Sequence, residues 1–373
     1  MNQPVYMDHN ATTPTRPQAV DAVVRAMQSG GNPSSVHSVG RKALRVLEDA
    51  REQVRGAVNA LKSAQVIFTS CGTEANSLAL QNCGRDKMFA GATDHPAVLQ
   101  ARDDIQRIAV DVNGLIDPFQ LEEMLAGGGD DTVISVMMAN NETGVLQQIE
   151  GIAHIAHRYH ALVHTDAVQA LGKVDVDFQA LGVDMMSLSA HKIGGPLGVG
   201  ALIATKDVKL TAQNAGGGQE NGLRGGTQNV PGIAGFGVAA ELAVSELAGM
   251  GRLKAMRDQL ETRILAIAPD AMVIATMADR LPNTSFISMP GVDAETQVMA
   301  FDLAGICVSA GSACASGKTK ASAVLGAMGV APDTAKSAVR VSLGLSNTED
   351  DIERFISAWC ELYQRKGAAR SAA

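Results

Sequence analysis

The feature that most constrains the fold is an alternation of short apolar runs with segments of helical periodicity between residues 65 and 205. The apolar runs are rich in β-branched residues and are the expected strands, at 65–70, 132–140, 161–167, 183–190 and 198–205. Helical spacing of apolar residues marks the expected helices of this region, 72–84 and 149–160. Strands that are apolar throughout are typical of a mostly parallel sheet covered by helices on both faces, so an α/β fold is predicted.

The chain changes character near residue 206, where a polar, glycine-rich stretch runs to 229. Further helices are expected at 17–29, 41–61, 231–247, 252–267, 294–304, 321–328 and 348–365. A chain of 373 residues has room for more than one domain. We therefore predict a large sheet domain over 15–250 and a smaller α+β domain that combines 1–14 with 251–373.

Composition disfavours several classes of protein. The net charge of −8 and an aromatic content of 3% argue against nucleic-acid binding, which needs a basic surface and stacking platforms. The apolar stretches are too short to span a bilayer, and the first residues lack the basic and apolar regions of a secretion signal, so we expect a cytoplasmic protein with no membrane contact. The five cysteines form no C-x-x-C pair, which indicates free thiols and no intrinsic metal site.

In open α/β sheets ligands bind beyond the carboxyl ends of the strands, so the residues that follow each strand carry the functional signal. Gly72 and Thr73 open a helix after the first strand, where main-chain amides can bind an anion. The polar residues at the other ends and loops are His95, Asn141, Asp166, Gln169, Ser189, His191 and Lys192. Each alone has an ordinary explanation, such as a helix cap or a solvated charge. Together they place an acid, a lysine, a histidine and an anion cradle at one rim.

Lys192 directly follows an apolar strand and precedes Gly-Gly-Pro. That placement predicts a confined amine whose pKa can fall, as lysines that form Schiff bases require. Asp166 at the same rim suits a pyridinium nitrogen, because a carboxylate stabilises the protonated ring as an electron sink. The combination predicts a pyridoxal 5′-phosphate enzyme.

Cys314 stands in the stretch SAGSACASGKTK, residues 309–320, among small loop-forming residues. The letters GKT resemble the end of a phosphate-binding loop, but Ser312 occupies the position where that motif needs its first glycine. Cys307 and Cys360 suit a buried structural role, whereas Cys314 does not. A flexible loop around Cys314 is predicted, because a thiol that works in two places needs a mobile tether.

A series of ordered motifs along nearly the whole length resembles the cysteine desulfurases of the NifS/IscS type, which are class-V aminotransferases with PLP fold type I. The motifs are YMDHNATTP, GNPSSVHSVG, FTSCGTEAN, NNETGVLQ, HTDAVQALGK, SAHKIGGPLGVGAL, GGGQENGLRGGT, SAGSACAS and VRVSLG. The resemblance implies a seven-stranded, mostly parallel sheet in the large domain, the smaller α+β C-terminal domain, and pyridoxal 5′-phosphate as cofactor.

The resemblance also implies roles for single residues. Lys192 would hold the cofactor as an aldimine and move protons, His95 would stack on the ring and assist, and Asp166 would pair with the ring nitrogen. Gln169 and Asn141 would lie at the ring oxygen, with Asn141 also near the substrate carboxylate. The phosphate group would be held by Gly72, Thr73, Ser189 and His191, and by Thr227 of a neighbouring subunit, which implies a homodimer. Arg340 would bind the substrate carboxylate, the alternative being an ordinary surface arginine on a strand.

The implied reaction converts L-cysteine to L-alanine and leaves the sulfur on Cys314 as a persulfide. The sulfur would pass to an acceptor such as an Fe–S scaffold, with which Cys314 could transiently share a cluster; tRNA thiolation and nitrogenase supply remain open. Two other functions are alternatives: a selenocysteine lyase, in which Cys314→Ser would retain activity, and a non-enzymatic partner protein, which would have lost the lysine or the cofactor cradle.

Overall fold

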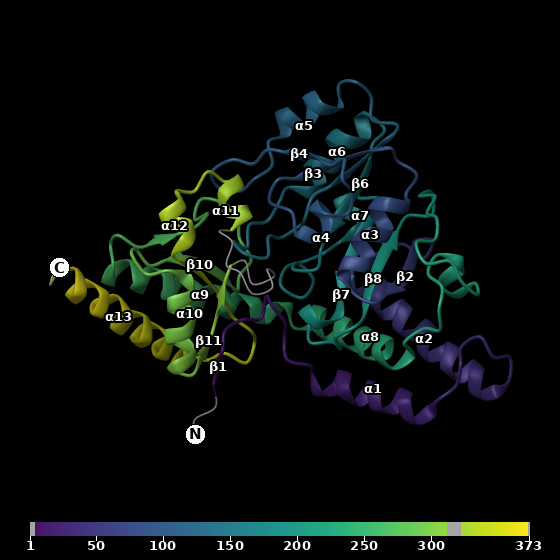
Figure 1. Ribbon diagram of the computed structural model, residues 1–373. Helices are drawn as coiled ribbons and strands as arrows, with labels where there is room; N and C mark the ends of the chain where they lie inside the picture. The colour runs from purple at the N-terminus through teal and green to yellow at the C-terminus, as the bar shows by residue number, and fades with distance from the viewer. Residues whose placement is uncertain (1–3, 312–321, 372–373) are drawn as a thin grey trace.

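The computed structural model describes residues 4–311 and 322–371, with side chains up to Arg365. A larger part built on a seven-stranded sheet lies beside a smaller part built on a four-stranded sheet, and the segment after β1 (Val5–Tyr6) passes from the smaller to the larger part (Figure 1). Cys314 and the flexible loop predicted around it lie outside the described residues.

The large sheet has the strand order β2-β8-β7-β6-β5-β3-β4. Its strands are β2 (Gln65–Thr69), β3 (Lys87–Gly91), β4 (Gln106–Ile108), β5 (Thr132–Ser135), β6 (Leu162–Asp166), β7 (Met185–Ser189) and β8 (Gly200–Ala204). Neighbouring strands from β7 to β4 are parallel, and only β8 runs antiparallel to its two neighbours. The predicted α/β fold with a mostly parallel sheet is therefore confirmed.

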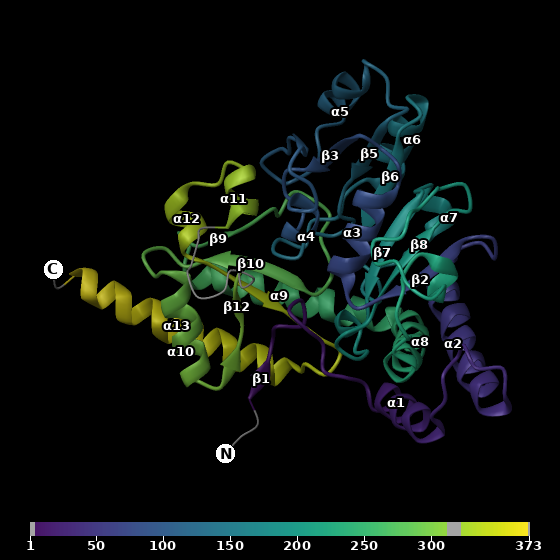
Figure 2. The ribbon, with the colours of Figure 1, turned by 45° about the vertical axis from the view of Figure 1, so that its right-hand side comes forward.

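Helices cover both faces of this sheet, because alternate strand residues point to opposite sides. Val66 and Phe68 of β2 pack in the same apolar cluster as α2 (Ser38–Ala57) and α8 (Val230–Ser245), whereas Ile67 between them packs with α3 (Gly72–Asn82). Figure 2 shows β2, β8 and β7 between α3 on one side and α2 and α8 on the other. The other helices of this part are α1 (Pro17–Ser29), α4 (Pro96–Leu99), α5 (Pro118–Leu125), α6 (Ile149–Arg158) and α7 (Phe178–Leu181).

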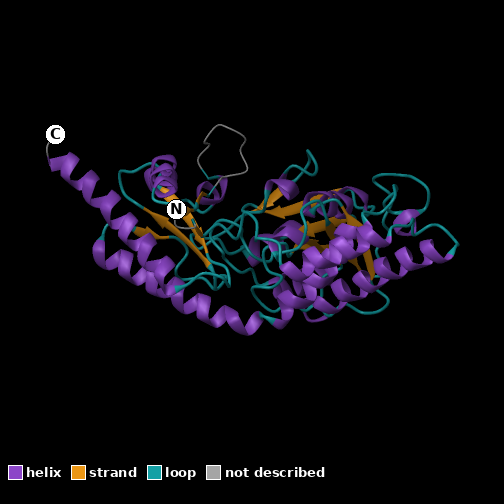
Figure 3. Cartoon of the chain, turned by 90° about the horizontal axis from the view of Figure 1, so that it is seen from below, coloured by secondary structure: helices purple, strands orange, loops and turns teal. Residues whose placement is uncertain are grey.

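The smaller part has the antiparallel order β12-β13-β10-β9, and β1 pairs with β11 in a separate parallel ladder. Its strands are β9 (Met272–Val273), β10 (Thr284–Ser288), β11 (Ile306–Cys307), β12 (Ser309–Ala310) and β13 (Ala338–Ser342). Its helices are α9 (Met250–Ile267), α10 (Ala294–Leu303), α11 (Ala323–Ala327), α12 (Pro332–Lys336) and α13 (Glu349–Ser371). Figure 3 shows helices along one side of both parts.

The two largest of the apolar clusters belong to different parts of the molecule. One runs from Ala19 to Leu281, and the other joins Val5 and Met7 to residues between 253 and 359. The domain limits at 14/15 and 250/251 remain predictions. Among the described residues no single helix is long and apolar enough to cross a bilayer. The length and composition are reached only by α8 together with the helical segment Leu247–Ile267, and the two are bent by 52° relative to each other.

The N-terminal crossing segment, residues 7–16, joins the two parts by main-chain hydrogen bonds. The amide of His9 donates to the carbonyl of Ser342 in β13 (3.1 Å), and the amide of Thr13 donates to the carbonyl of His191 after β7 (2.9 Å). This segment therefore touches the polar ends of both sheets at once.

Candidate active site

A cavity of about 340 Å³ lies between the carboxyl edge of the large sheet and the small sheet. It gathers residues from the loops after β2, β5, β6 and β7, from the crossing segment and from β13. Ten of the residues predicted from the sequence line it: Gly72, Thr73, His95, Asn141, Asp166, Gln169, Ser189, His191, Lys192 and Arg340. The roles assigned to them remain predictions, but the structure brings all ten to one place.

Lys192 ends the short 3₁₀ turn η1 (Ala190–Lys192) that follows β7. Its Nζ donates to the carbonyl of Asn10 at 2.6 Å and to that of Ala11 at 2.9 Å. The crossing segment thus supplies main-chain acceptors that hold the amine at the cavity wall.

Asp166 ends β6, and both of its carboxylate oxygens accept a hydrogen bond. Oδ2 accepts from Asn76 Nδ2 at 2.7 Å and Oδ1 from the amide of Val168 at 3.0 Å. Neither donor is a cation, so the carboxylate keeps its negative charge available for a positive group in the cavity. The Oδ1 atom of Asn76 is buried and has no hydrogen-bond partner among the described residues.

The N-terminus of α3 forms one end of the cavity. A Cβ built on Gly72 would stand 2.9 Å from Cγ2 of Val168 and 3.4 Å from Cβ of Ser189, so only glycine brings this main chain so close to the loops after β6 and β7. Exposed amides of a first helical turn beside the hydroxyls of Thr73 and Ser189 form a cradle suited to a phosphate. Burial, with smaller contributions from Lys192 and Lys173, lowers the pKa of His191 to about 4, so this imidazole is neutral at neutral pH.

His95 precedes the first turn of α4, and its Nδ1 accepts a hydrogen bond from the amide of Ala97 at 3.1 Å. A main-chain amide can only donate, so the neutral ring must carry its hydrogen on Nε2. Burial lowers the pKa of His95; the charge of Asp166 opposes this shift and that of Lys192 reinforces it. The ring is therefore held as a neutral imidazole with a defined tautomer.

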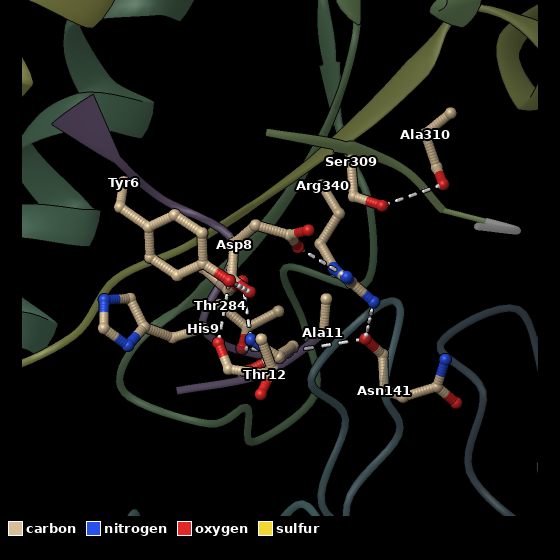
Figure 4. A network of polar contacts seen from close by, with 12 residues as sticks. Tyr6, Asp8, His9, Ala11, Thr12, Asn141, Thr284, Ser309, Ala310 and Arg340 are labelled. Atoms are coloured by element: carbon tan, nitrogen blue, oxygen red, sulfur yellow. Dashed lines mark hydrogen bonds and ion pairs between the residues drawn. The ribbon is translucent and has the colours of Figure 1, made fainter. Parts of the chain in front are cut away.

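Arg340 comes from the middle of β13, and only 4% of its side chain is exposed. One terminal nitrogen pairs with Asp8 Oδ1 at 2.7 Å, and the other donates to the carbonyl of Asn141 at 2.8 Å. Figure 4 shows the guanidinium between these two partners. Its Nε is buried without a hydrogen-bond partner among the described residues. This burial rules out an ordinary surface arginine.

Gln169 lies in the turn after β6 and is held from two sides. Its Nε2 donates to the carbonyl of Asn10 at 2.9 Å, and its Oε1 accepts from Nζ of Lys173 at 2.6 Å. Lys173 and Lys192 also line a second cavity of about 490 Å³, on the side where the crossing segment meets the beginning of α9.

Thr227 does not line the cavity around Lys192. It lines a separate cavity of about 250 Å³ with residues of β2 and of the loop before β8. Cys314 lies outside the described residues, although Gly311, the last described residue before it, lines the main cavity.

Sequence reasoning assigned no role to Asp8, Asn10, Asn76 or Lys173, each of which contacts a predicted site residue. All four stand inside the motifs that carry the family resemblance, but the motif letters do not say which side chains meet. For Lys173, the available signal was its place four residues after Gln169, because side chains at that spacing lie side by side wherever the chain coils as a helix does.

Comparison with known proteins gives consistent results. The model of the family described as "Aminotransferase class-V" matches residues 5–355. The chain is 42% identical to a cysteine desulfurase of Cereibacter sphaeroides, with 94% of each chain covered, and 38% identical to the cysteine desulfurase NifS of Azotobacter vinelandii, with 94% of this chain and 90% of that protein covered. The solved structure of a NifS-like protein from Rickettsia africae superposes with a TM-score of 0.91 at 37% identity, over 97% of this chain and 100% of that one.

Proposed function

Because the chain belongs to the class-V aminotransferase family, as a pyridoxal phosphate-dependent cysteine desulfurase of the NifS/IscS type, we propose that the cavity around Lys192 is its active site. We further propose that the sulfur removed from L-cysteine is transferred to Cys314, which makes the enzyme a sulfurtransferase. The observation that carries this proposal is that the lysine, the acid, the anion cradle and the buried arginine share one cavity of about 340 Å³.

The residues of the cavity fit pyridoxal phosphate. The phosphate group would lie against Gly72, Thr73, Ser189 and His191, where a Cβ on Gly72 would intrude. The carboxylate of Asp166 would pair with the ring nitrogen, and Gln169 and Asn141 would lie at the ring oxygen. When bound, the cofactor supplies an electron sink that stabilises charge at the substrate's Cα and weakens the bond to sulfur.

Lys192 would attach the cofactor and afterwards move a proton to and from the Cα of the substrate. The carbonyls of Asn10 and Ala11 support this role because they accept from the amine and hold it at the cavity wall. His95 would contribute as a neutral imidazole whose hydrogen sits on Nε2, so at that atom it donates a hydrogen bond or a proton. Protonation of Nδ1 would cost the hydrogen bond from Ala97.

Arg340 would bind the carboxylate of L-cysteine. Its guanidinium lines the same cavity as the cofactor cradle and is held there by Asp8 and the carbonyl of Asn141. A planar guanidinium binds a carboxylate more tightly than a point charge does. The same contacts set the distance between the carboxylate site and Lys192, because both residues are bound to the crossing segment.

The proposed transfer balances as L-cysteine plus the Cys314 thiol giving L-alanine plus the Cys314 persulfide. The thiolate of Cys314 would attack the substrate sulfur, the carbon–sulfur bond would break, and the electron pair would pass to the carbon fragment with a proton. The persulfide sulfur would then move to an acceptor protein such as an Fe–S scaffold. A cytoplasmic location remains part of this proposal.

A homodimer is also proposed, with Thr227 reaching the phosphate of the neighbouring subunit. The position of Thr227 outside its own subunit's main cavity supports this. Exposed apolar side chains on α1, on α2 and in the loop between them support it as well, since such a patch is typical of an interface. They are Val20, Val24, Met27, Val36, Val39 and Leu44.

The test uses purified protein loaded with pyridoxal phosphate and then given L-cysteine. We expect a visible absorption band, release of L-alanine, and one added sulfur on the peptide 309–320 by mass spectrometry. Cys314→Ser should keep the band but lose the added sulfur, and Lys192→Ala should lose covalent attachment of the cofactor. A protein that stays colourless would contradict the cofactor assignment, and a coloured protein that never carries sulfur on Cys314 would contradict the transfer step.

A further inference from the structure

Lys173 is a buried lysine that pairs with no carboxylate of the residues that the structure describes. It stands four residues after Gln169, and 7% of the residue is exposed. No ion pair includes it within residues 4–311 and 322–365, and its Nζ donates to two amide oxygens, Gln169 Oε1 at 2.6 Å and Asn10 Oδ1 at 3.0 Å. Burial, together with the charges of Lys192 and Arg340, lowers its pKa well below the usual range. Burying a lysine amine costs free energy, so a lysine at this position is expected to have a specific role.

The contacts of Lys173 fix how the amide of Gln169 is turned. A carbonyl can only accept, so Nε2 of Gln169 must face the carbonyl of Asn10, and Oε1 must face Lys173. Without Lys173, Oε1 would be buried without a donor, which favours a turned or displaced amide. An amide group has two N–H donors, so the second Nε2 hydrogen is left to the cavity that Gln169 lines.

The same lysine also holds Asn10. With Oδ1 accepting from Lys173, Asn10 Nδ2 donates to Thr284 Oγ1 at 2.9 Å. The main-chain carbonyl of Asn10 in turn accepts from Lys192 and from Gln169. Lys173 therefore joins the turn after β6 to the crossing segment, next to the Asn10 carbonyl that accepts from Lys192 and Gln169, and both of these residues line the cavity.

We propose that Lys173 is a positioning residue that turns the Gln169 amide so that it presents an N–H donor, and not its oxygen, to the ring oxygen of the bound cofactor. This inference rests on the proposed function, in which the cofactor ring lies beside Gln169. A donor at the ring oxygen draws electron density from that oxygen. The oxygen then holds less tightly the proton that it would share with the nitrogen of Lys192. Loss of Lys173 should then make that proton harder to remove.

The experiment is a spectroscopic pH titration of the cofactor-loaded protein without substrate, which reads protonation of the chromophore and not turnover. We expect Lys173→Met to raise the titration midpoint by about 0.5–1 pH unit, the size expected for one lost hydrogen bond. The titratable and charged groups of the described residues that line the cavity are Cys71, His95, Asp166, His191, Lys192 and Arg340, and all are retained in this variant. Arg257→Met, which also removes a buried basic side chain, but from α9, should leave the midpoint unchanged.

The double variant decides whether Lys173 acts through Gln169. Gln169→Ala should raise the midpoint by itself, and adding Lys173→Met to it should raise it no further. A K173M protein that titrates like the wild type and is only less stable would overturn the proposal, as would a K173M shift that persists in the Gln169→Ala background.

A second variant covers the case in which K173M does not fold. Lys173→Gln keeps an amide N–H donor, and the K173Q/Q169A protein should titrate like Q169A; a further shift overturns the proposal. Failure of the proposed function looks different, because the wild type would then show no cofactor band to titrate.

Discussion

The two sheets contribute to the cavity in different ways. The large sheet presents Asp166, Ser189 and Lys192 from the ends of parallel strands or just beyond them, where the chain leaves the sheet. The small sheet presents Arg340 from the middle of β13, between Val339 and Val341 of an apolar core. At the edge of a parallel sheet, polar side chains gather because the strands end there. A charge in the middle of a strand must be neutralised by a residue from outside the sheet.

The two charged groups illustrate the consequence of this difference. Asp166 is held by neutral donors, Asn76 and the amide of Val168, and so keeps its charge for a ligand. Arg340 is held by an ion pair with Asp8 of the crossing segment. A buried charge is costly unless it is paired and hydrogen-bonded. We infer that the charge of Asp166 is positioned by contacts within the large part, whereas the charge of Arg340 depends on the crossing segment being in place.

The largest effect expected is on the cofactor side. Lys192→Ala should lower kcat for alanine formation by about 10³-fold or more, because attachment of the cofactor and proton transfer are both lost. The phosphate cradle and Asp166 remain, so cofactor should still bind without a covalent link, as equilibrium dialysis would measure. Arg340→Ala is the matched control and should leave the cofactor band intact while raising KM for cysteine. Loss of cofactor binding in R340A would break the proposed division between the two sides.

The interior of the large sheet should make folding sensitive to acid. His164 is fully buried between Ser135 and Ser187, and burial lowers its pKa to about 3. The folded ring stays neutral while the unfolded ring protonates near its ordinary pKa of about 6.5, so stability is full above that value and is lost as the pH falls below it. From pH 8 to pH 5 this group alone should cost about 2 kcal/mol.

Denaturant unfolding of the wild type and of His164→Gln at both pH values checks this expectation. The variant should be less stable at pH 8 but lose less on acidification. His9 and His191, whose pKa values burial also lowers to about 4, stay in both proteins, so their effects cancel in the comparison. Equal losses for the two proteins would contradict the assignment to His164.

On the substrate side, Asp8→Asn should raise KM for cysteine by about 10-fold with little change in kcat, since one charge-assisted hydrogen bond to Arg340 is weakened. Steady-state kinetics with cysteine measure KM and kcat separately. Asp103→Asn, an exposed site away from the cavity, is the control. A fall in kcat with KM unchanged would show that Asp8 does not act through Arg340.

An effect of similar size, on stability and not on catalysis, is expected where the two parts touch. Ser322 before α11 donates to Glu142, a residue of the loop after β5, and its oxygen also caps α11 at the amide of Leu325. Ser322→Ala should lower the free energy of unfolding by about 1–2 kcal/mol, from the lost cap and a buried carboxyl without its donor. Burial already raises the pKa of Glu142, so this carboxyl can become neutral when the contact is lost. Exposed Ser346→Ala should change stability little, and an equal loss there would contradict the prediction.

Much of the large part was predictable from the sequence, and the exceptions have physical reasons. Apolar runs located five of its seven strands, but β3 begins with the charged Lys87, and β4 has only three residues, two of them exposed. The expected strand 132–140 ends at Ser135, although the amides of Val136 and Met138 still donate to carbonyls of β6, and the last helix runs to Ser371 and not to 365.

The candidate site likewise contains residues that the sequence could predict and residues that it could not. Residues next to strand ends could be placed together because parallel strands end at one edge. The role of Asp8 could not be assigned, since its partner Arg340 is 332 positions away along the chain, and the contact of Lys173 with Asn10 likewise spans 163 positions.

By itself, the sequence determined the α/β class, the rim where polar residues collect, and the chemistry that a lysine, an acid and an anion cradle can perform together. These follow from local periodicity and from short-range spacing. The tertiary structure alone decided that the N-terminal segment crosses between the sheets, that Asp8 neutralises Arg340, and that Lys173 joins Gln169 to Asn10. Contacts between distant segments depend on how whole layers pack, and no local pattern of residues records that.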